Sequence, residues 1–395
     1  MGRLARGGTA LCASVAIAAC GSNDAGRGIA VERTDSAGIE IVQSPGTDQP
    51  LEWRIEEVGV IDSESTEAGV FEPSSYAIGA DDAGRIFALD RSGNRVVVFD
   101  ADGNFVRSLG GRGGGPGEVQ FPLALVVADD GSSAVFDGAK RRFVWFGADG
   151  SVMPEGEFSA PFFGGTMRQT DAGLIYDSNR AVEGTPGRSG IAIAGGDSAI
   201  TVIERDNEPT RPIELASCGM GFSGLPPIFA PQIRWDAHGA RVAAAPEADY
   251  EIRIFDDGRE VRRVRRAVEP RAATPELAAR ELGEGMRVRT DGGERVCRTD
   301  EVVEQRGFAP VVPAIRRIAL DPQGGMWVQR AGIADEPQPI DVFAPDGAYL
   351  GTLPQDTPFP AAFLPDGRYA AVTVDELDVT RIVIVRVHAP VFRDE

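Results

Sequence analysis

The sequence predicts an all-β fold, a six-bladed β-propeller of four-stranded antiparallel blades, and three observations lead to it. There are 49 Gly and 27 Pro, together 76 of the 395 residues, which indicates many tight turns and few long helices. Short apolar segments separate the turns, and Tyr250–Ile254 alternates apolar and polar residues as a half-buried strand does. Turns of the Asp-x-x-Gly or Asp-Gly type recur along the chain, and repeats of this kind are typical of propeller blades.

The recurring turns divide the chain into units of strand, turn, strand, loop, strand, turn and strand. The first turn of each unit is marked by a glycine, and these glycines are Gly84, Gly131, Gly173, Gly239, Gly324 and Gly367. In three units a second turn glycine follows 19 residues later, at Gly103, Gly150 and Gly258. The basic repeat is 42 to 47 residues long. Glycine is expected here because tight hairpins require a positive φ, which glycine adopts without a Cβ clash.

Ring closure requires one blade to take strands from both ends of the chain, since the first and last blades otherwise leave open sheet edges. The C-terminal strands expected at 369–374 and 381–387 lack a fourth partner. We assign Trp53–Val58 as that outer strand. The segment 38–43 is expected to add a further strand, whose position the sequence does not define.

The first residues have the layout of a secretory signal. Arg3 and Arg6 precede an apolar and small-residue stretch from Thr9 to Ala19, and no acidic residue occurs before Asp24. The stretch has about 11 residues, whereas a helix that spans a bilayer needs roughly 20. We therefore interpret it as an export signal and not as a transmembrane helix.

The end of this stretch, Ile17-Ala18-Ala19-Cys20-Gly21-Ser22, resembles the lipobox of bacterial lipoproteins. The resemblance implies that Cys20 becomes the lipidated first residue of the mature chain; the alternative is an ordinary signal peptide with an incidental cysteine. The expected organisation is a signal peptide with lipobox (1–20), a flexible tether (21–37) and the propeller (38–395). The protein would then be exported to the cell envelope and held by its lipid at the outer membrane or facing the periplasm.

The first two units resemble NHL-repeat propellers. The residues that carry the resemblance are Asp90, Asn94–Phe99 and Asp102-Gly103 in the first unit, and Gly114–Glu118, Phe121-Pro122, Asp129–Gly131, Asp137, Arg142–Phe146 and Asp149-Gly150 in the second. More broadly, the chain is similar to the uncharacterised TolB-like, six-bladed propeller lipoproteins of bacteria. Later units keep only the turns and strands, and Arg141 stands where the first unit has Asn94. The resemblance implies a fold and leaves the ligand open.

Two connectors, 206–230 and 267–314, are longer than a propeller needs. Both lead from an outer strand to the next inner strand, so they are expected on one face, opposite the Asp-Gly turns. The second should contain a short helix between blades four and five, with Thr274 as N-cap and Pro275 at the first helical position. Long loops on a rigid scaffold are where binding usually resides, although a lid over the channel fits equally well.

Each insertion contains one cysteine. Cys218 and Cys297 are the only thiols left once the signal is removed and Cys20 is lipidated. Export favours a disulfide between them over two separate buried cysteines.

The composition excludes some classes of function. A net charge of −20 opposes a phosphate backbone, so no nucleic-acid partner is expected. Two histidines and four cysteines make a His-rich metal site improbable, and no metal or cofactor is expected. An arginine-rich segment, 259–266, is interpreted as a charged outer edge strand that resists sheet pairing rather than as an anion site.

Candidate ligand contacts are the polar and aromatic residues expected on the inner strands and on the loops of the insertion face. They are Arg95, Arg142, Arg168, Arg234, Trp235 and Arg316. Arg95 lies five residues after Asp90, and Arg142 lies five residues after Asp137. Each pair can equally form a structural ion pair within its own loop. Arg317 and Phe363 share the cationic and aromatic character of the expected channel, which suits an anionic ligand better than a divalent metal.

The sequence favours a monomeric, non-catalytic binding module that recognises an envelope protein or a glycan through the face with the insertions. The membrane would be contacted through the lipid anchor alone. The alternative is a propeller hydrolase or lyase of the lactonase kind, with its site at the central channel, and a purely structural scaffold is a third class. No catalytic residue is assigned.

Overall fold

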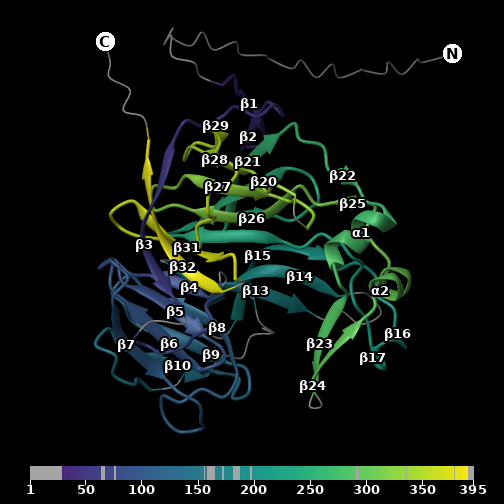
Figure 1. Ribbon diagram of the computed structural model, residues 1–395. Coiled ribbons are helices and arrows are strands. Elements are labelled where there is room, and N and C mark those ends of the chain that lie inside the picture. Colours follow the sequence, from purple (N-terminus) through teal and green to yellow (C-terminus); the bar gives the residue numbers. More distant parts are fainter. Residues whose placement is uncertain are drawn as a thin grey trace, which may run out of the picture.

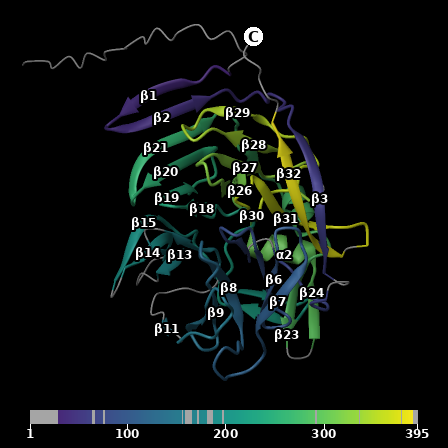
Figure 2. The ribbon, with the colours of Figure 1, turned by 90° about the vertical axis from the view of Figure 1, so that its left-hand side faces the viewer.

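Six antiparallel sheets surround a central channel, and the fold is a six-bladed β-propeller (Figures 1 and 2). The computed structural model describes residues 29–63, 67–74, 77–154, 156–157, 165–170, 173–180, 187–195, 198–290, 293–334, 336–377 and 379–389. The expected signal peptide, 1–20, and its Cys20 lie outside these residues. Neither helix in the described part of the chain is long or apolar enough to cross a membrane.

Each blade runs from an inner strand at the channel to an outer strand. Blade 1 contains β4 (Ile78–Ala80), β5 (Ile86–Asp90), β6 (Arg95–Phe99) and β7 (Phe105–Gly110). Blade 2 contains β8 (Pro122–Val127), β9 (Ser133–Asp137), β10 (Arg142–Phe146) and β11 (Gly156–Glu157). Blade 3 contains β12 (Met167–Thr170), β13 (Gly173–Arg180), β14 (Arg188–Gly195) and β15 (Ser198–Asp206).

The remaining blades include the join between the two ends of the chain. Blade 4 contains β18 (Arg234–His238), β19 (Arg241–Ala245), β20 (Glu251–Asp256) and β21 (Arg259–Arg266). Blade 5 contains β26 (Ile315–Leu320), β27 (Met326–Arg330), β28 (Ile340–Phe343) and β29 (Tyr349–Thr352). Blade 6 contains β30 (Ala362–Phe363), β31 (Arg368–Val374), β32 (Thr380–His388) and, from the N-terminal part of the chain, β3 (Arg54–Asp62).

The middle strands are apolar on both sides because each blade packs between two others. All five residues of β5 are buried. Ile86 and Ala88 contact the core shared with blade 6, whereas Phe87 and Leu89 contact the core shared with blade 2. Successive side chains on a strand point to opposite faces, so a continuous apolar run is expected for a strand that is covered on both sides.

The first turn of blade 1 shows why aspartate and glycine recur. Oδ1 of Asp81 accepts hydrogen bonds from the backbone amides of Ala83 (3.1 Å) and Arg85 (2.8 Å), which closes the turn. Gly84 has φ of +76°, a conformation that a side chain disfavours. The same geometry recurs at Asp321 and Gly324 in blade 5, where Oδ1 accepts from the amides of Gln323 and Gly325.

The ring is closed as the sequence predicts. β3 pairs antiparallel with β32, from Arg54 opposite His388 to Asp62 opposite Arg381. The strand begins one residue later than the expected Trp53–Val58 and extends to Asp62, with a bulge between Glu57 and Gly59. In Figure 2 β3 lies along the outer side of β32.

The N-terminal hairpin occupies a position that the sequence did not define. β1 (Glu32–Ser36) and β2 (Ile39–Ser44) form a hairpin, and β2 pairs in parallel with β21 on the outside of blade 4 (Figure 2). β1 thus occupies part of the segment 21–37, which was expected to be a flexible tether.

The interpretation of 259–266 as an exposed edge strand is wrong, because β2 covers β21. Its guanidinium groups are instead neutralised by neighbouring carboxylates: Arg262 pairs with Glu40 of β2, and Arg265 pairs with Glu251 of β20.

The chain that leads from β2 to β3 crosses blade 5, and we call residues 39–62 the closing segment. The backbone amide of Thr352 donates to the carbonyl of Gln49 (2.8 Å), and the amide of Leu51 donates to the carbonyl of Thr352 (2.8 Å). Pro50 and Thr352 form a parallel bridge. The closing segment therefore contacts blades 4, 5 and 6 in turn.

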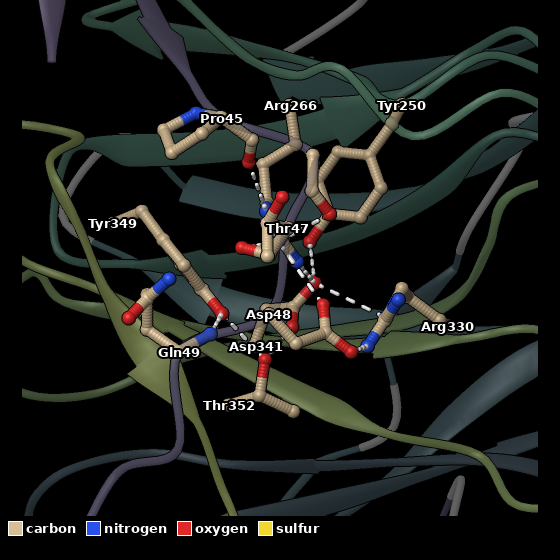
Figure 3. Close-up of polar contacts among 11 residues, drawn as sticks. Pro45, Thr47, Asp48, Gln49, Tyr250, Arg266, Arg330, Asp341, Tyr349 and Thr352 are labelled. Carbon is tan, nitrogen blue, oxygen red and sulfur yellow. Dashed lines mark hydrogen bonds and ion pairs between the residues drawn. The ribbon is translucent and has the colours of Figure 1, made fainter. Parts of the chain in front are cut away.

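A buried ion pair lies where the closing segment crosses between blades 4 and 5 (Figure 3). Nη1 of Arg266, at the end of β21, donates to Oδ2 of Asp341 on β28 (2.7 Å), and both side chains are fully buried. Nη2 of Arg266 also donates to Oδ1 of Asp48 (3.1 Å). The same guanidinium donates to three carbonyls of the closing segment, those of Pro45, Gly46 and Thr47.

Two hydroxyl groups also donate to Asp341. Tyr250 donates its hydroxyl to Oδ2 (2.7 Å), and Thr352 donates its hydroxyl to Oδ1 (2.7 Å). Burial and the adjacent carboxylate raise the pKa of Tyr250 well above its usual value. Tyr250, the first residue of the alternating segment 250–254, is a buried part of this network. Buried charges are tolerated when opposite charges and hydrogen bonds surround them, as around Asp341.

The two insertions fold together into a small unit beside the propeller (right of Figure 1). The first contains the hairpin of β16 (Ile213–Leu215) and β17 (Met220–Phe222). The second contains β22 (Arg271–Ala272), α1 (Pro275–Leu282), β23 (Met286–Thr290), β24 (Gly293–Cys297), α2 (Thr299–Arg306) and β25 (Val311–Val312). The helix expected after Thr274 is α1, and the Thr274 hydroxyl accepts the amide of Leu277 (3.3 Å).

A disulfide and a carboxylate join the two insertions. Cys218 and Cys297 are bonded and lie in a common apolar cluster with Ile213, Leu215 and Val302. Glu301 of α2 accepts the backbone amides of Ala216 (2.7 Å) and Ser217 (3.0 Å) at the turn of the first hairpin.

Replacing Arg266 with methionine is expected to lower the free energy of unfolding by about 3–5 kcal/mol, because the buried Asp341 loses the guanidinium that donates to it at 2.7 Å and keeps only the longer ion pair with Arg330, at 3.4 Å. Chemical denaturation measures the change. The matched control is Arg263→Met on the same strand; its partner is Glu260 and its side chain is 29% exposed. That control should cost about 0–1 kcal/mol. Equal losses for the two variants would contradict the importance assigned to the buried pair.

Reducing the Cys218–Cys297 disulfide is expected to destabilise the insertion unit by roughly 2–5 kcal/mol, because the bond closes a loop across a sequence separation of 79 residues. The test uses residues 21–395, which omit the expected signal peptide and Cys20, digested by a protease with and without dithiothreitol. Cleavage should become faster within 206–230 and 267–314 while the blades stay resistant. Identical cleavage patterns in both conditions would rule out this role for the disulfide.

Candidate functional site

The central channel holds a cavity of about 1080 Å³ that is lined by the inner strands of all six blades. Such a volume lies just above the usual range for ligand pockets, roughly 300–1000 Å³. Inner strands begin on the insertion face and end at the first turns. The cavity therefore has an insertion end and a turn end.

The two ends differ in charge. The turn end is lined by carboxylates and one histidine, namely Asp81, Asp82, Asp129 and His238. The insertion end is lined mainly by arginines, together with two carboxylates; these residues are Arg91, Arg205, Arg234, Arg316 and Arg317, with Asp177 and Glu208. This is a local concentration of cations in a chain whose net charge is −20.

Asp236 fixes the middle of the channel wall. Its Oδ1 accepts Nε of Arg168 on β12 (2.7 Å), and its Oδ2 accepts the backbone amide of Leu320 on β26 (2.9 Å). One carboxylate on the inner strand of blade 4 thus links the inner strands of blades 3 and 5. Arg168, a predicted ligand contact, lines the cavity and is held by this ion pair.

Asp177 and Trp235 form a second fixed pair near the insertion end. The indole Nε1 of Trp235 donates a short hydrogen bond to Oδ1 of Asp177, and the backbone amide of Thr166 donates to Oδ2 (2.7 Å). Burial raises the pKa of Asp177 above its ordinary value, although Trp235, Thr166 and the nearby charge of Arg234 act in the opposite sense. The result is a desolvated acceptor that lines the cavity in a defined orientation.

The arginines at the insertion end are positioned by aromatic and acidic neighbours. The guanidinium of Arg317 lies 4.2 Å above the ring of Phe359. Arg316 approaches Glu281 of α1 at 3.9 Å, which joins the channel mouth to the insertion unit. Arg205 donates to the carbonyl of Pro231 and lies 3.4 Å from Glu208. Arginine presents a planar set of donors, which suits carboxylates and phosphates.

Four of the six predicted contact residues line this cavity: Arg168, Arg234, Trp235 and Arg316. The structure does not bring Arg95 and Arg142 to it. Nε of Arg95 donates to Asp90 (2.9 Å). This is the structural ion pair within the loop that the sequence offered as the alternative to a ligand contact. Arg142 lies opposite Asp137 in the register of β9 and β10, and Asp137 accepts the backbone amides of Gln120 and Phe121.

The buried Asp90 shows how such an ion pair within a loop is stabilised. Burial opposes its charge, but hydrogen bonds from Gly93, Arg95 and Ser92 together outweigh burial and lower the pKa of Asp90.

Three residues of the site were missed in the sequence: Asp177, Arg205 and Asp236. Asp177 and Arg205 lie on a second and an outer strand, not on an inner one. β13 and β14 are eight residues long, whereas the inner strand β12 has four. Asp177 lies one residue past the last β12–β13 pair, Met167 with Tyr176. For Asp177, the available signal was the length of the second strand of blade 3, which extends beyond the inner strand β12.

Within the described residues, no three His, Cys, Asp or Glu side chains lie close enough together to hold a metal ion. The cations and aromatic rings of the cavity are likewise no ligand set for a divalent metal.

Comparisons with known proteins agree with the fold. A family model for 6-bladed β-propellers, DUF5128, matches residues 76–206. A predicted exported protein of Bacteroides fragilis has a similar structure, with 14% identity, coverage of 88% of this chain and 99% of that chain, and a TM-score of 0.52. No curated protein matches the sequence.

Two further solved structures are similar at lower scores. A member of the DUF4221 family from Bacteroides vulgatus has 10% identity, with 86% of this chain and 99% of that chain covered and a TM-score of 0.47. A streptogramin B lyase has 14% identity, with 85% and 98% covered and a TM-score of 0.38. At these identities the similarity concerns the fold alone.

Proposed function

We propose that this protein is an exported, lipid-anchored propeller that binds an acidic ligand without catalysis at the insertion end of its channel. The observation that carries the proposal is the convergence of Arg205, Arg234, Arg316 and Arg317 on one end of a cavity of about 1080 Å³. The rest of the proposal follows from charge, geometry and the N-terminal sequence.

Charge supports selectivity for an acid. A chain with net charge −20 repels anions over most of its surface, so a local group of arginines in a concave site concentrates binding there. A cavity with low-dielectric walls strengthens each interaction between a guanidinium and a carboxylate or phosphate.

Geometry supports binding rather than catalysis. Both oxygens of Asp236 are used to link blades 3, 4 and 5, and both oxygens of Asp177 accept N–H groups. These carboxylates shape and rigidify the wall. Rigid walls lower the entropic cost of binding.

The location follows from the N-terminal sequence. Arg3 and Arg6, the apolar stretch 9–19 and the lipobox-like Ile17–Cys20 support export followed by lipidation at Cys20. The similar protein of Bacteroides fragilis is itself a predicted exported protein. The insertion unit with its disulfide suits an oxidising compartment.

Replacing Arg234 with glutamine is expected to weaken acid binding by about tenfold or more, because one charge-assisted donor is lost from the site. Titration calorimetry measures binding of phosphate, citrate and galacturonate, with neutral galactose for comparison. The matched control is Arg287→Gln on the exposed hairpin β23–β24; the Arg287 side chain is 60% exposed, and the variant should bind like the wild type. The proposal fails if no acid binds the wild type, or if Arg234→Gln binds acids unchanged.

Replacing Cys20 with serine is expected to move the protein from the membrane fraction to the soluble fraction, because the acyl chains that hold it are lost. The measurement is fractionation of expressing bacteria together with labelling by a radioactive fatty acid. Cys12→Ser is the control, since Cys12 is removed with the signal, and it should remain membrane-bound and labelled. A Cys20→Ser protein that stays labelled and membrane-bound would overturn the anchor.

A further inference from the structure

The open edge of β1 differs from the outer edges of the blades. β1 pairs with β2 over five residues without a register shift, and all five of its residues are exposed. β3, β7 and β15 each pair with their neighbour through a bulge, and β11 has only two residues. The closing segment covers β21 and β29. Because bulges and covering segments hinder strand pairing, β1 is the one regular open edge among the described outer strands. In Figure 2 it is the outermost strand of its sheet.

The turn of the hairpin determines which backbone groups of β1 point outward. The turn residues 37 and 38 have φ of +56° and +83°, as in a two-residue type I′ turn. Ser36 and Ile39, which flank the turn, are therefore a hydrogen-bonded pair, and bonded and non-bonded pairs alternate from there along the strand. It follows that the N–H and C=O groups of Arg33 and Asp35 point away from β2. These groups have no hydrogen-bond partner among the described residues.

A second copy of the same strand fits this edge in one symmetric register. With a two-fold axis at Thr34, Arg33 of each copy lies opposite Asp35 of the other, and the two pairs exchange four backbone hydrogen bonds. Opposite charges then face each other across the two strands, which is stabilising. The other symmetric registers that pair the outward groups place Arg33 opposite Arg33, or Asp35 opposite Asp35. The charges of β1 therefore select the register centred on Thr34.

The side chains of Arg33 and Asp35 keep the capacity for this contact. Arg33 donates to Glu40 (2.6 Å) and to the carbonyl and carboxylate of Asp346, which uses three of its five N–H groups. Oδ1 of Asp35 accepts the amide of Gly38 (3.3 Å), and a carboxylate offers about four lone-pair positions. Asp35 also lies directly opposite Glu40 in the hairpin. A further cation beside these two like charges is therefore favourable.

We propose that two copies of this protein pair antiparallel through β1, in the register centred on Thr34, and form one continuous sheet across the two-fold axis. The contact is small, and two chains of net charge −20 repel one another, so the pairing is weak in dilute solution. It forms between copies that the anchor proposed above holds on one membrane. This dimer differs from the monomer that the sequence favours.

The length of the tether supports pairing at a membrane. Eleven residues, 21–31, separate Cys20 from β1, and they reach at most about 40 Å. Every anchored copy therefore keeps its β1 edge close to the same surface. Confinement of this kind raises the effective concentration of one edge for another, so a contact of few hydrogen bonds suffices.

Cross-linking of the variant Thr34→Cys tests the pairing. Residues 21–395 with an N-terminal histidine tag are bound to vesicles that carry a nickel-chelating lipid, in about 0.15 M salt, which screens the repulsion between chains beyond roughly 8 Å. The two copies of residue 34 form a non-hydrogen-bonded pair with Cα atoms about 4.5 Å apart, so mild oxidation should link them by a disulfide. No other thiol interferes, because Cys218 and Cys297 are bonded to each other and are the only cysteines after residue 20.

The matched control is Ser36→Cys on the same strand. In the proposed register the two copies of residue 36 lie four positions apart along the strands, or about 14 Å, which is too far for a disulfide. This variant should give about a tenth of the Thr34→Cys dimer or less. A mixture of Glu32→Cys and Ser36→Cys should form a mixed dimer, since these residues lie opposite one another. Mass spectrometry identifies the linked peptides.

Charge exchange tests the contact between Arg33 and Asp35. Adding either Arg33→Asp or Asp35→Arg to Thr34→Cys should reduce cross-linking about threefold or more, because each change places like charges opposite one another. An equal mixture of the two double variants should restore cross-linking, because each copy then meets its complement. Restoration also shows that both variants keep the hairpin.

Three results would overturn the proposal. They are the absence of a Thr34→Cys dimer, equal cross-linking by Thr34→Cys and Ser36→Cys, which indicates random collision, and a charge-exchanged mixture that cross-links no better than its components. The tag holds the protein on the vesicles without a lipid at Cys20. Failure of the pairing is therefore distinguished from failure of the proposed anchor, which the Cys20→Ser variant tests separately.

Discussion

Closure of the ring is the constraint on which the rest of this structure depends, and one stretch of chain accomplishes it. The closing segment pairs with blade 4 through β2, crosses blade 5 beside Thr352, and supplies the outer strand of blade 6 as β3. At the crossing, the buried pair of Arg266 and Asp341 joins blade 4 to blade 5. Because Arg266 also donates to three carbonyls of the closing segment, the charges are satisfied only when that segment is in place. Because breaking a buried pair is costly, its contacts disfavour arrangements in which the closing segment is displaced.

The candidate site is rigid because the closed ring holds its walls in place. Inner strands are short, with two to six residues, and none could hold a cavity wall by itself. Asp236 links three of them, and the apolar cores between blades fix their spacing. The insertion unit adds a second support, since Glu281 of α1 lies beside Arg316. Arginines that repel one another are thus held at one end of the channel by neighbouring carboxylates and by the ring of Phe359. A ligand then meets a preformed set of donors and acceptors.

Local patterns in the sequence predicted most of the fold, and long-range contacts account for what was missed. The Asp-Gly turns are local, so the six units, the helix after Thr274 and the closing strand could be predicted from spacing and capping alone. The position of β2 depends on a parallel pairing across more than two hundred residues, which no local pattern encodes. For the same reason the segment 259–266 was misinterpreted as an edge strand. In the site, Arg234 could be predicted because it lies on an inner strand, and inner strands are identified by counting strands along the chain. Asp177, in contrast, lines the cavity because β13 extends beyond its last pair with β12.

Amide hydrogen exchange on the intact mature protein tests the central claim most directly. If the closing segment is an integral part of the ring, the amides of β3 and of Thr352 should exchange as slowly as those of β31 and β32, through global unfolding alone. Arg266 and Asp341 should lie in peptides of the same slow class. Fast exchange of residues 39–62, with the six blades still protected, would show that the propeller is closed without the closing segment and would contradict this account.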